Sequence, residues 1–265
     1  MKVEIHETPD AIGAHLADRI VAGIRAANAG DRAYVLGCPG GRSPLPVYRA
    51  LESRLAKEPV DCSQLIVVMM DEYLSADDAG GFAPPSASAH YSCRGFGERE
   101  IVGRINRGLP DEFRIPHQNF WMPDIAAPED YDARIVAAGG IDLFLLASGA
   151  GDGHIAFNPP GSSRESGTRI VALAEQTRRD NLATFPEFTD ISEVPSHGVT
   201  IGIGSIAEQS KAVAMIVWGE GKRHAFYRLT AAGAYDASWP ATIAVECRNA
   251  ELLADAAAAG QWGAR

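Results

Sequence analysis

A carboxylate and an imidazole stand two residues apart, as Asp152 and His154, soon after a run of apolar residues. Residues 143–147 are all apolar and predict a strand buried on both faces, and the glycines that follow predict a tight turn. In a parallel α/β sheet such a turn lies at the carboxyl ends of the strands, where ligands bind. A carboxylate beside an imidazole at that place is suited to proton transfer, so the pattern indicates an enzyme.

The same segment has a structural interpretation as well, and it does not fit a dinucleotide cofactor. Asp-Gly is a common turn dipeptide, and a histidine beside it can simply cap the next helix. The spacing of Gly149, Gly151 and Gly153 does not match the Gly-x-Gly-x-x-Gly fingerprint. No acidic residue on a clear following strand could hold a ribose. We therefore expect no nicotinamide or flavin cofactor.

A second pair of carboxylates, Asp71 and Glu72, ends another apolar run. Residues 65–70 are apolar without interruption and predict a buried strand. Both carboxylates cannot turn into the core, so at least one must face the sheet edge or the solvent. Close to Asp152 and His154 it would add a base to an acid/base pair, as moving a proton between adjacent sugar carbons requires. The alternative is that Asp71 caps a turn or a helix.

A glycine-rich loop leads into a helix that is predicted to begin near Pro44, and this loop could hold a phosphate group. Gly40 and Gly41 allow the backbone to approach an anion, and the first N–H groups of the helix point at it. Arg42 adds a fixed positive charge and Ser43 a hydroxyl donor. The P-loop spacing is missing, so the loop predicts a single phosphate rather than a nucleoside triphosphate. An ordinary turn between strand and helix is the alternative.

Lys222 is a second candidate for holding an anion. It follows a strand predicted over residues 213–218 and a turn that contains two glycines, so it would project at the same carboxyl edge as residues 40–43. A lysine at the start of a helix is usually just solvated, and only this shared position makes it a candidate. Local cations matter here because the net charge of −10 repels an anionic substrate.

Segments with helical and strand-like patterns alternate along almost the whole chain. Strands are predicted over residues 33–37, 65–70, 142–147, 169–173, 198–203, 213–218 and 243–246. Helices are predicted over residues 8–27, 44–55, 90–102, 128–138, 221–230 and 249–258. This alternation implies an α/β fold, with a mostly parallel sheet covered by helices on both faces and the site at the carboxyl ends of the strands.

Two segments lack such patterns and predict loops. Residues 76–89 predict a surface loop, and residues 175–195 predict an irregular, mobile lid. Neither is a linker that would divide the chain. We therefore expect residues 1–265 to form one domain.

The composition narrows the class of protein and its setting. With 265 residues, 46% of them hydrophobic, the chain can bury one large core. Its four cysteines form no Cys-x-x-Cys pair, which predicts a reduced, cytoplasmic protein without a disulfide framework or a cysteine zinc site. The polar N-terminus does not resemble a signal peptide, and no apolar run could cross a membrane. The net negative charge argues against binding to nucleic acid.

Four separated motifs follow one another in a specific order. They are residues 39–44, residues 70–73, residues 152–158, and residues 194–204 with Lys222 beyond them. Together they resemble the glucosamine-6-phosphate deaminase/isomerase and 6-phosphogluconolactonase superfamily over most of the chain. Met-Asp-Glu-Tyr and Asp-Gly-His-Ile-Ala-Phe-Asn are similar to the deaminase/isomerase branch, whereas the lactonases usually read Asp-Glu-Arg and Asp-Gly-His-Thr-Ala-Ser.

The resemblance implies a Rossmann-like sheet, no metal and no organic cofactor. It implies that Asp71 is the general base that moves a proton between C2 and C1 of an open-chain sugar. His154, oriented by Asp152, would assist ring opening at O5. The substrate contacts would be Gly40, Gly41, Arg42, Ser43, Glu72 and Lys222, with Gly41, Ser43 and Lys222 on the 6-phosphate.

The reaction implied by the resemblance converts an amino-sugar 6-phosphate to a ketose 6-phosphate with release of ammonia. The expected ligand is therefore a small phosphorylated sugar. No nucleic acid or membrane is expected as a partner, and a homo-oligomer is left open.

Two positions depart from the pattern of the family. The deaminases carry a Glu that supports the catalytic histidine, where this chain has Pro159. They also bring an Arg from the lid to the phosphate, and the matching position here is Ala183, with Arg178 and Arg179 before it. A proline cannot orient an imidazole, so the departures leave open both the sugar and the reaction.

Two other functions stay open for this reason. In a lactonase, His154 would activate water to attack the carbonyl of a phosphorylated lactone, and Pro159 favours this because no supporting Glu is then needed. A sugar-phosphate sensor without catalysis is the other alternative, and the acid/base candidates argue against it.

Overall fold

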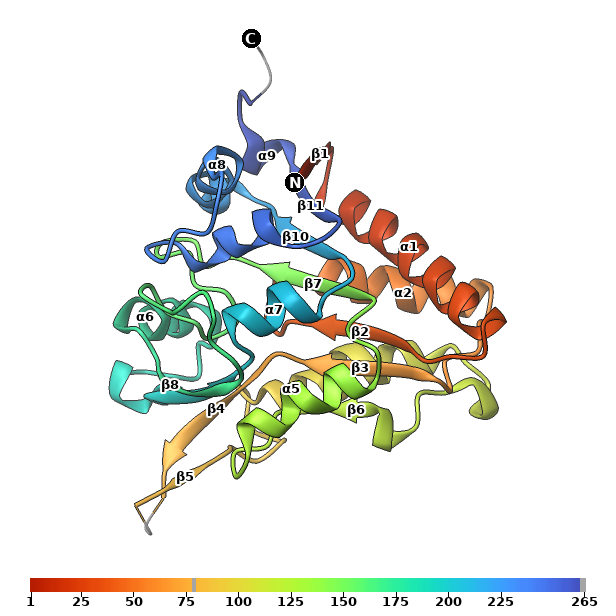
Figure 1. Cartoon of the computed structure of the whole chain (residues 1–265), viewed down its shortest axis with the longest axis horizontal. Coiled ribbons are helices and arrows are strands. Elements are labelled where there is room, and N and C mark those ends of the chain that lie inside the picture. Colours follow the sequence, from red (N-terminus) through yellow and green to blue (C-terminus); the bar gives the residue numbers. More distant parts are fainter. Residues whose placement is uncertain (78–79, 263–265) are drawn as a thin grey trace.

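The computed structural model describes residues 1–77 and 80–262, and its centre is a parallel sheet of seven strands (Figure 1). From one edge to the other, the strands are β1 (Lys2–His6), β11 (Ala250–Asp255), β10 (Val213–Val217), β7 (Leu143–Ala147), β2 (Tyr34–Cys38), β3 (Leu65–Met69) and β6 (Phe120–Trp121). Each neighbouring pair is parallel. The predicted α/β fold with a mostly parallel sheet is confirmed.

The central strands are buried on both faces, which is why their sequences are apolar without interruption. Leu36 and Val67 pack into the core on one face of the sheet, and Val35 and Val68 pack into the core on the other. All four are fully buried. Because side chains alternate along a strand, a continuous apolar run requires cover on both sides.

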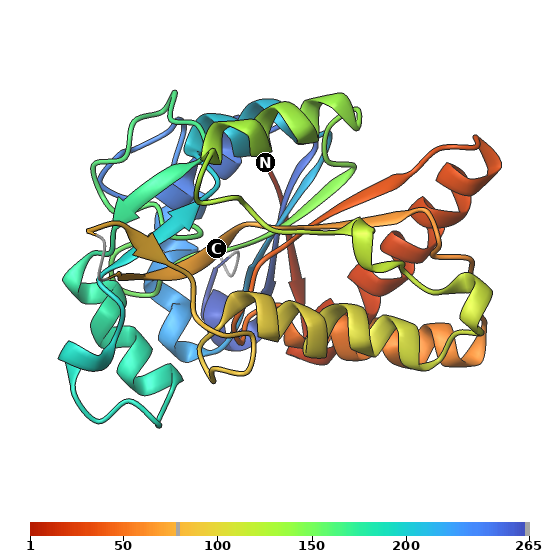
Figure 2. The same ribbon diagram turned by 90° about the horizontal axis from the view of Figure 1, so that it is seen from below.

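Helices supply that cover on both faces of the sheet (Figure 2). One core contains residues of α1 (Pro9–Ala29), α2 (Leu45–Lys57) and α4 (Gly103–Arg107). The other core contains residues of α5 (Pro128–Ala137), α7 (Ile203–Gln209), α8 (Arg223–Ala231) and α9 (Ala256–Ala259). The two cores hold the strands rigidly, so the loops at their carboxyl ends have a fixed base.

A smaller antiparallel sheet lies beside the carboxyl ends of the large one (Figure 1). Its strands, in order, are β5 (Phe82–Ala83), β4 (Asp71–Ala76), β9 (His197–Thr200) and β8 (Arg169–Ala172). Only Met70 separates β3 from β4, so the chain passes directly from the large sheet into the small one. Asp71 is thus the first residue of the small sheet, and this sheet was not predicted from the sequence.

Two elements near the C-terminus were predicted as the wrong type. Residues 243–246, predicted as a strand, lie in a 3₁₀ helix (Pro240–Glu246). Residues 249–258, predicted as a helix, form mainly β11, which pairs with strands on both sides. Leu252 and Leu253 are fully buried there, so tertiary burial overrides the helical preference of an alanine-rich segment.

The two predicted loops also contain regular elements. The segment 175–195 was predicted to be irregular, but it contains α6 (Glu175–Thr184) and a 3₁₀ turn (Ile191–Glu193). The segment 76–89 includes residues 78 and 79, which lie outside the described residues, and its remainder contains β5. Within the described residues, no helix combines the length and apolar character needed to cross a membrane.

Candidate active site

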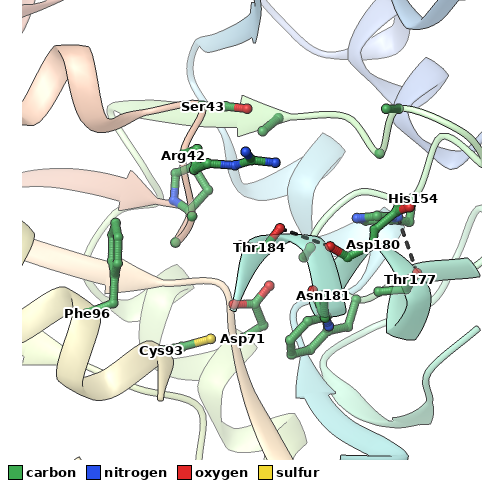
Figure 3. A pocket seen from close by; sticks show the side chains of 18 of the residues that line it. Arg42, Ser43, Asp71, Cys93, Phe96, His154, Thr177, Asp180, Asn181 and Thr184 are labelled. Atoms are coloured by element: carbon green, nitrogen blue, oxygen red, sulfur yellow. Dashed lines mark hydrogen bonds between the residues drawn. The ribbon is translucent and has the colours of Figure 1, made fainter. Parts of the chain in front are cut away.

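A cavity of about 630 Å³ opens at the carboxyl ends of β2, β3 and β7 (Figure 3). This volume is within the usual range for small-molecule sites. Its lining includes the predicted site residues Gly40, Gly41, Arg42, Ser43, Asp71, His154 and Lys222. Segments far apart in the sequence therefore meet at one place, as their positions at strand ends predicted.

His154 and Asp152 form a hydrogen-bonded pair in the turn after β7. Nδ1 of His154 lies 2.7 Å from Oδ1 of Asp152, and the backbone N–H of His154 donates to the same oxygen at 3.1 Å. Burial raises the pKa of Asp152, but the hydrogen bonds and charge of His154 outweigh it and hold the pKa below the usual value. The carboxylate thus stays ionised and fixes the ring, which leaves Nε2 for a ligand.

The turn that carries this pair depends on Gly153. Its φ is +67°, in the left-handed region that favours glycine. A side chain at this position would also collide with the indole ring of Trp239. A glycine is therefore required between the acid and the imidazole.

Thr177 is a third member of this group that was missed in the sequence. It lies on α6, and its hydroxyl is 3.3 Å from Oδ2 of Asp152 and 3.3 Å from Nδ1 of His154 (Figure 3). Its spacing to Asn181 and Thr184, four and seven residues on, is that of one helix face and could have revealed it. All three line the cavity.

Asp71 is buried at the junction of the two sheets, with its side chain in the cavity wall. Burial raises the pKa of its carboxyl to about 7. A hydrogen bond from the Cys93 thiol opposes this rise, the nearby Glu72 carboxylate adds to it, and His154 opposes it. Figure 3 shows the sulfur beside the carboxylate. A carboxyl with such a pKa can accept or release a proton near neutral pH.

Glu72 was predicted to contact the substrate, but it is not among the cavity-lining residues. Its carboxylate accepts hydrogen bonds from the backbone N–H groups of Tyr73, Cys93 and Arg94 and from the hydroxyl of Ser92. Successive residues of a strand face opposite ways, so Asp71 and Glu72 have different surroundings. Glu72 therefore holds the N-terminus of the short helix α3 (Cys93–Phe96) rather than facing the cavity.

The loop of residues 40–43 and Lys222 form the basic end of the cavity. Gly41 has a φ of +79°, which lets the loop turn before α2. The Ser43 carbonyl accepts a hydrogen bond from the Trp218 indole at 2.9 Å, which ties the loop to β10. The Lys222 ammonium donates to the carbonyl of Ser148. This end therefore presents backbone N–H groups, a hydroxyl and two cations.

The charge of Lys222 depends on its neighbours. Burial lowers the pKa of its ammonium, the nearby Asp180 raises it, Arg42 lowers it and Asp152 raises it. An anion bound beside Lys222 and Arg42 would favour the charged lysine further. The basic end of the cavity is thus suited to a phosphate group.

The two arginines of α6 do not reach this end of the cavity. Arg178 donates to the carbonyls of Ile191 and Val194 at 2.6 and 2.8 Å, which ties α6 to the segment after it. Arg179 pairs with Glu175 on the surface of the helix. The side chain of Ala183 is not described. Among the described residues, the arginine that lines the cavity is Arg42.

Known proteins of similar sequence include several glucosamine-6-phosphate deaminases. The chain is 39% identical over 228 residues to a glucosamine-6-phosphate deaminase of Beutenbergia cavernae, covering 86% of this chain and 81% of that protein. It is 38% identical over 262 residues to a glucosamine-6-phosphate deaminase of Mycolicibacterium smegmatis, covering 98% and 92%. No family model matches the chain.

Solved structures with the same fold include a deaminase and a lactonase. A monomeric glucosamine-6-phosphate deaminase superposes with a TM-score of 0.82 at 26% identity, covering 98% of this chain and 99% of that one. A 6-phosphogluconolactonase from Trypanosoma cruzi superposes with a TM-score of 0.70 at 16% identity, covering 99% and 97%. The second likeness concerns the fold alone.

The raised pKa of Asp71 predicts a specific dependence of stability on pH. In the unfolded chain this carboxyl ionises near pH 3.8, but in the folded protein it ionises only near pH 7. The contribution of the protonated carboxyl to the free energy of unfolding is therefore complete below pH 3.8, and it is lost as the pH rises from about 4 to 7. Asp71→Asn removes this loss, so the free energy of unfolding of the variant should exceed that of wild type at pH 8 by about 4 kcal/mol.

The measurement is the free energy of unfolding in urea at several pH values from 5 to 8, for wild type and Asp71→Asn. The matched control is Asp124→Asn, which removes an exposed carboxylate. A stability difference that stays constant between pH 5 and 8 would contradict the raised pKa.

Proposed function

The chain belongs to the glucosamine-6-phosphate deaminase family, and from this premise we propose that it converts an amino-sugar 6-phosphate to a ketose 6-phosphate and ammonia. One observation carries the proposal: buried Asp71 and His154, whose ring is hydrogen-bonded to Asp152, line the same cavity, whose basic end suits a phosphate. An aldose-to-ketose conversion needs a base for a carbon-bound proton, an acid/base group for the ring and an anchor that fixes the sugar.

The anchor comes first in the proposed mechanism. The 6-phosphate binds the N–H groups of Gly40 and Gly41 and the hydroxyl of Ser43, with Arg42 and Lys222 supplying the positive charge. With the phosphate at this end, the sugar extends toward Asp71 and His154, which line the same cavity. Arg42 thus supplies the charge that other deaminases take from a lid arginine.

His154 then opens the ring. With its Nδ1–H donated to Asp152, Nε2 carries a lone pair that accepts the proton of the anomeric hydroxyl and returns a proton to O5. The C1–O5 bond breaks, and C1 becomes an aldehyde. Thr177, which contacts both side chains, supports the ring in place of the glutamate that Pro159 replaces.

Asp71 next moves the proton between the two carbons. Its carboxylate removes the proton from C2, and the electron pair left behind forms a double bond to C1. The electron pair of the C1 carbonyl moves to O1, which takes a proton from the ammonium at C2, giving an enol that carries a neutral amine. The carboxyl returns the proton to C1, which leaves an iminium at C2. Water adds to that carbon, the C2–N bond breaks, and a ketone and ammonia are released. A pKa near 7 makes Asp71 competent both to take and to give the proton.

We propose that α6 acts as a lid over the bound sugar. It contributes Thr177, Asn181 and Thr184 to the cavity wall, and Phe185 follows it. The ring of Phe185 packs edge-on against Tyr73 of β4, with 6.3 Å between the ring centres. The lid in this position shields the bound sugar from bulk solvent.

The direct test is an assay with glucosamine 6-phosphate, galactosamine 6-phosphate and 6-phosphogluconolactone, following ammonia, ketose and acid together. We expect ammonia and ketose 6-phosphate in equal amounts from an amino sugar. Asp71→Asn should lower kcat by about 10²–10⁴-fold, the usual range for loss of a general base, with Asp124→Asn as the matched control.

The outcome that contradicts the proposal is specific. A lactonase needs His154 and the phosphate anchor but no base for a carbon-bound proton, and Pro159 is compatible with it. Acid release from the lactone that survives Asp71→Asn and is lost in His154→Gln, without ammonia from either amino sugar, would therefore establish the lactonase.

The proposed role of Arg42 predicts a separate effect on binding. Arg42→Gln removes a charge-assisted hydrogen bond to the phosphate, so KM should rise about 10- to 100-fold with a smaller change in kcat. Arg179→Gln removes an arginine that pairs with Glu175 on the helix surface, and it should leave both constants unchanged. Equal KM values for Arg42→Gln and wild type would exclude Arg42 from the phosphate site.

A further inference from the structure

Three potential metal ligands converge where β1 packs beside α1, outside the cavity lining. Glu4 and His6 are two residues apart on β1 and so project from the same face of the strand, and His15 lies on α1. Oε2 of Glu4 is 3.7 Å from Nε2 of His6 and 3.9 Å from Nε2 of His15. The three ligand atoms lie within 4.8 Å of one another.

These three atoms face one another without forming hydrogen bonds. Both imidazole–carboxylate distances exceed the 3.2 Å limit typical of hydrogen bonds with N–H donors. Nε2 of His6 is buried and has no hydrogen-bond partner in the structure. A buried polar atom without a partner costs free energy, and a metal ion bound to Nε2 of His6 would remove that cost.

The carboxylate is already held in the orientation that such a ligand would need. Its Oε1 accepts the ammonium of Lys2 at 2.5 Å, and its Oε2 is directed toward the two imidazoles. One oxygen of Glu4 therefore remains available for coordination.

We propose that Glu4, His6 and His15 bind a zinc ion. Two imidazole nitrogens and one carboxylate oxygen are a ligand set that zinc uses, with water in the fourth position. Magnesium and calcium prefer oxygen ligands, so they fit this set poorly. This site goes beyond the proposed function and does not depend on it.

The ligand atoms need only a small movement to close on the ion. Zinc–ligand bonds of about 2.0–2.2 Å in a tetrahedron place the ligand atoms ~3.4 Å apart. His15 is 39% exposed in its side chain and can move toward Glu4 and His6 without disturbing the core. Its exposure also leaves a path for the ion and room for the water ligand.

The ion would connect the edge of the sheet to the first helix. β1 is the edge strand and pairs with β11 alone among the described strands, so a bond to α1 would hold it from a second side. Zinc that binds only the folded chain raises its thermal stability. Turnover should change little, because the three ligands do not line the cavity.

The test is calorimetric titration of the full chain with zinc chloride after treatment with a chelator. We expect one zinc per wild-type chain and at least 10-fold weaker binding in His15→Ala. His117→Ala is the matched control, because His117 is exposed and lies on a 3₁₀ turn away from β1, and it should bind zinc as wild type does. Magnesium chloride tests whether any divalent cation binds through charge alone, and we expect no magnesium binding.

A thermal melt of the same proteins provides the second measurement. Zinc should raise the Tm of wild type and His117→Ala but not of His15→Ala, while all three melt alike in chelator. If His15→Ala melts lower in chelator, Glu4→Gln takes its place with the same expectation. Absence of zinc binding by wild type, or equal binding by wild type and the ligand variants, would overturn the proposal.

Discussion

The burial of one carboxylate, that of Asp71, is the constraint on which the rest of the site depends. The chain leaves the parallel sheet after Met69 and enters the antiparallel sheet at Asp71, which pairs with Thr200 of β9. The carbonyl of Met70 accepts a hydrogen bond from the N–H of Ile201 at 2.8 Å, so the end of β9 holds the backbone of this junction in place. The carboxylate cannot withdraw into water, and burial therefore raises its pKa to about 7.

The other charged groups of the site differ from Asp71 in protonation and in sign of charge. The Asp152 carboxylate stays ionised because it is bonded to His154 and Thr177, so two acids in one cavity have pKa values shifted in opposite directions. Such a separation allows one acid to exchange a proton while the other only orients a ring. At the opposite end, Arg42 and Lys222 provide local positive charge in a chain whose net charge is −10.

The sequence predicts what depends on local patterns. The buried strands predicted over residues 65–70 and 142–147 are recognisable because the apolar runs 65–70 and 143–147 need cover on both faces. The polar residues that follow these runs share one edge of the sheet. Strand β11 was missed because its alanines favour a helix until neighbouring strands bury it. The small sheet was missed because β4 pairs antiparallel with β9, more than 100 residues further along the chain, and no local pattern specifies that partner.

The errors at the site have the same origin. Glu72 stands next to Asp71 in the sequence, and only the pairing of β4 decides which of the two faces the cavity. Thr177 was missed because its segment is polar and has no apolar pattern that predicts a helix. Only the folded structure shows that this helix lines the cavity. The resemblance predicted Asp71, His154 and the residues of the phosphate anchor, whereas the contacts of Thr177 with Asp152 and His154 are visible only in three dimensions.

The most direct test of the central claim is the pH dependence of kcat/KM for wild type and Cys93→Val, with glucosamine 6-phosphate as substrate. The account predicts that kcat/KM of wild type falls about tenfold per pH unit below pH 7, because Asp71 must be ionised to act as a base. Cys93→Val keeps Asp71 buried but removes the thiol hydrogen bond that lowers its pKa, so the fall in kcat/KM should begin at a higher pH in this variant. An ionisation of the substrate would give a fall at the same pH in both proteins. A limb near pH 4, or one at the same pH in both proteins, would contradict the account.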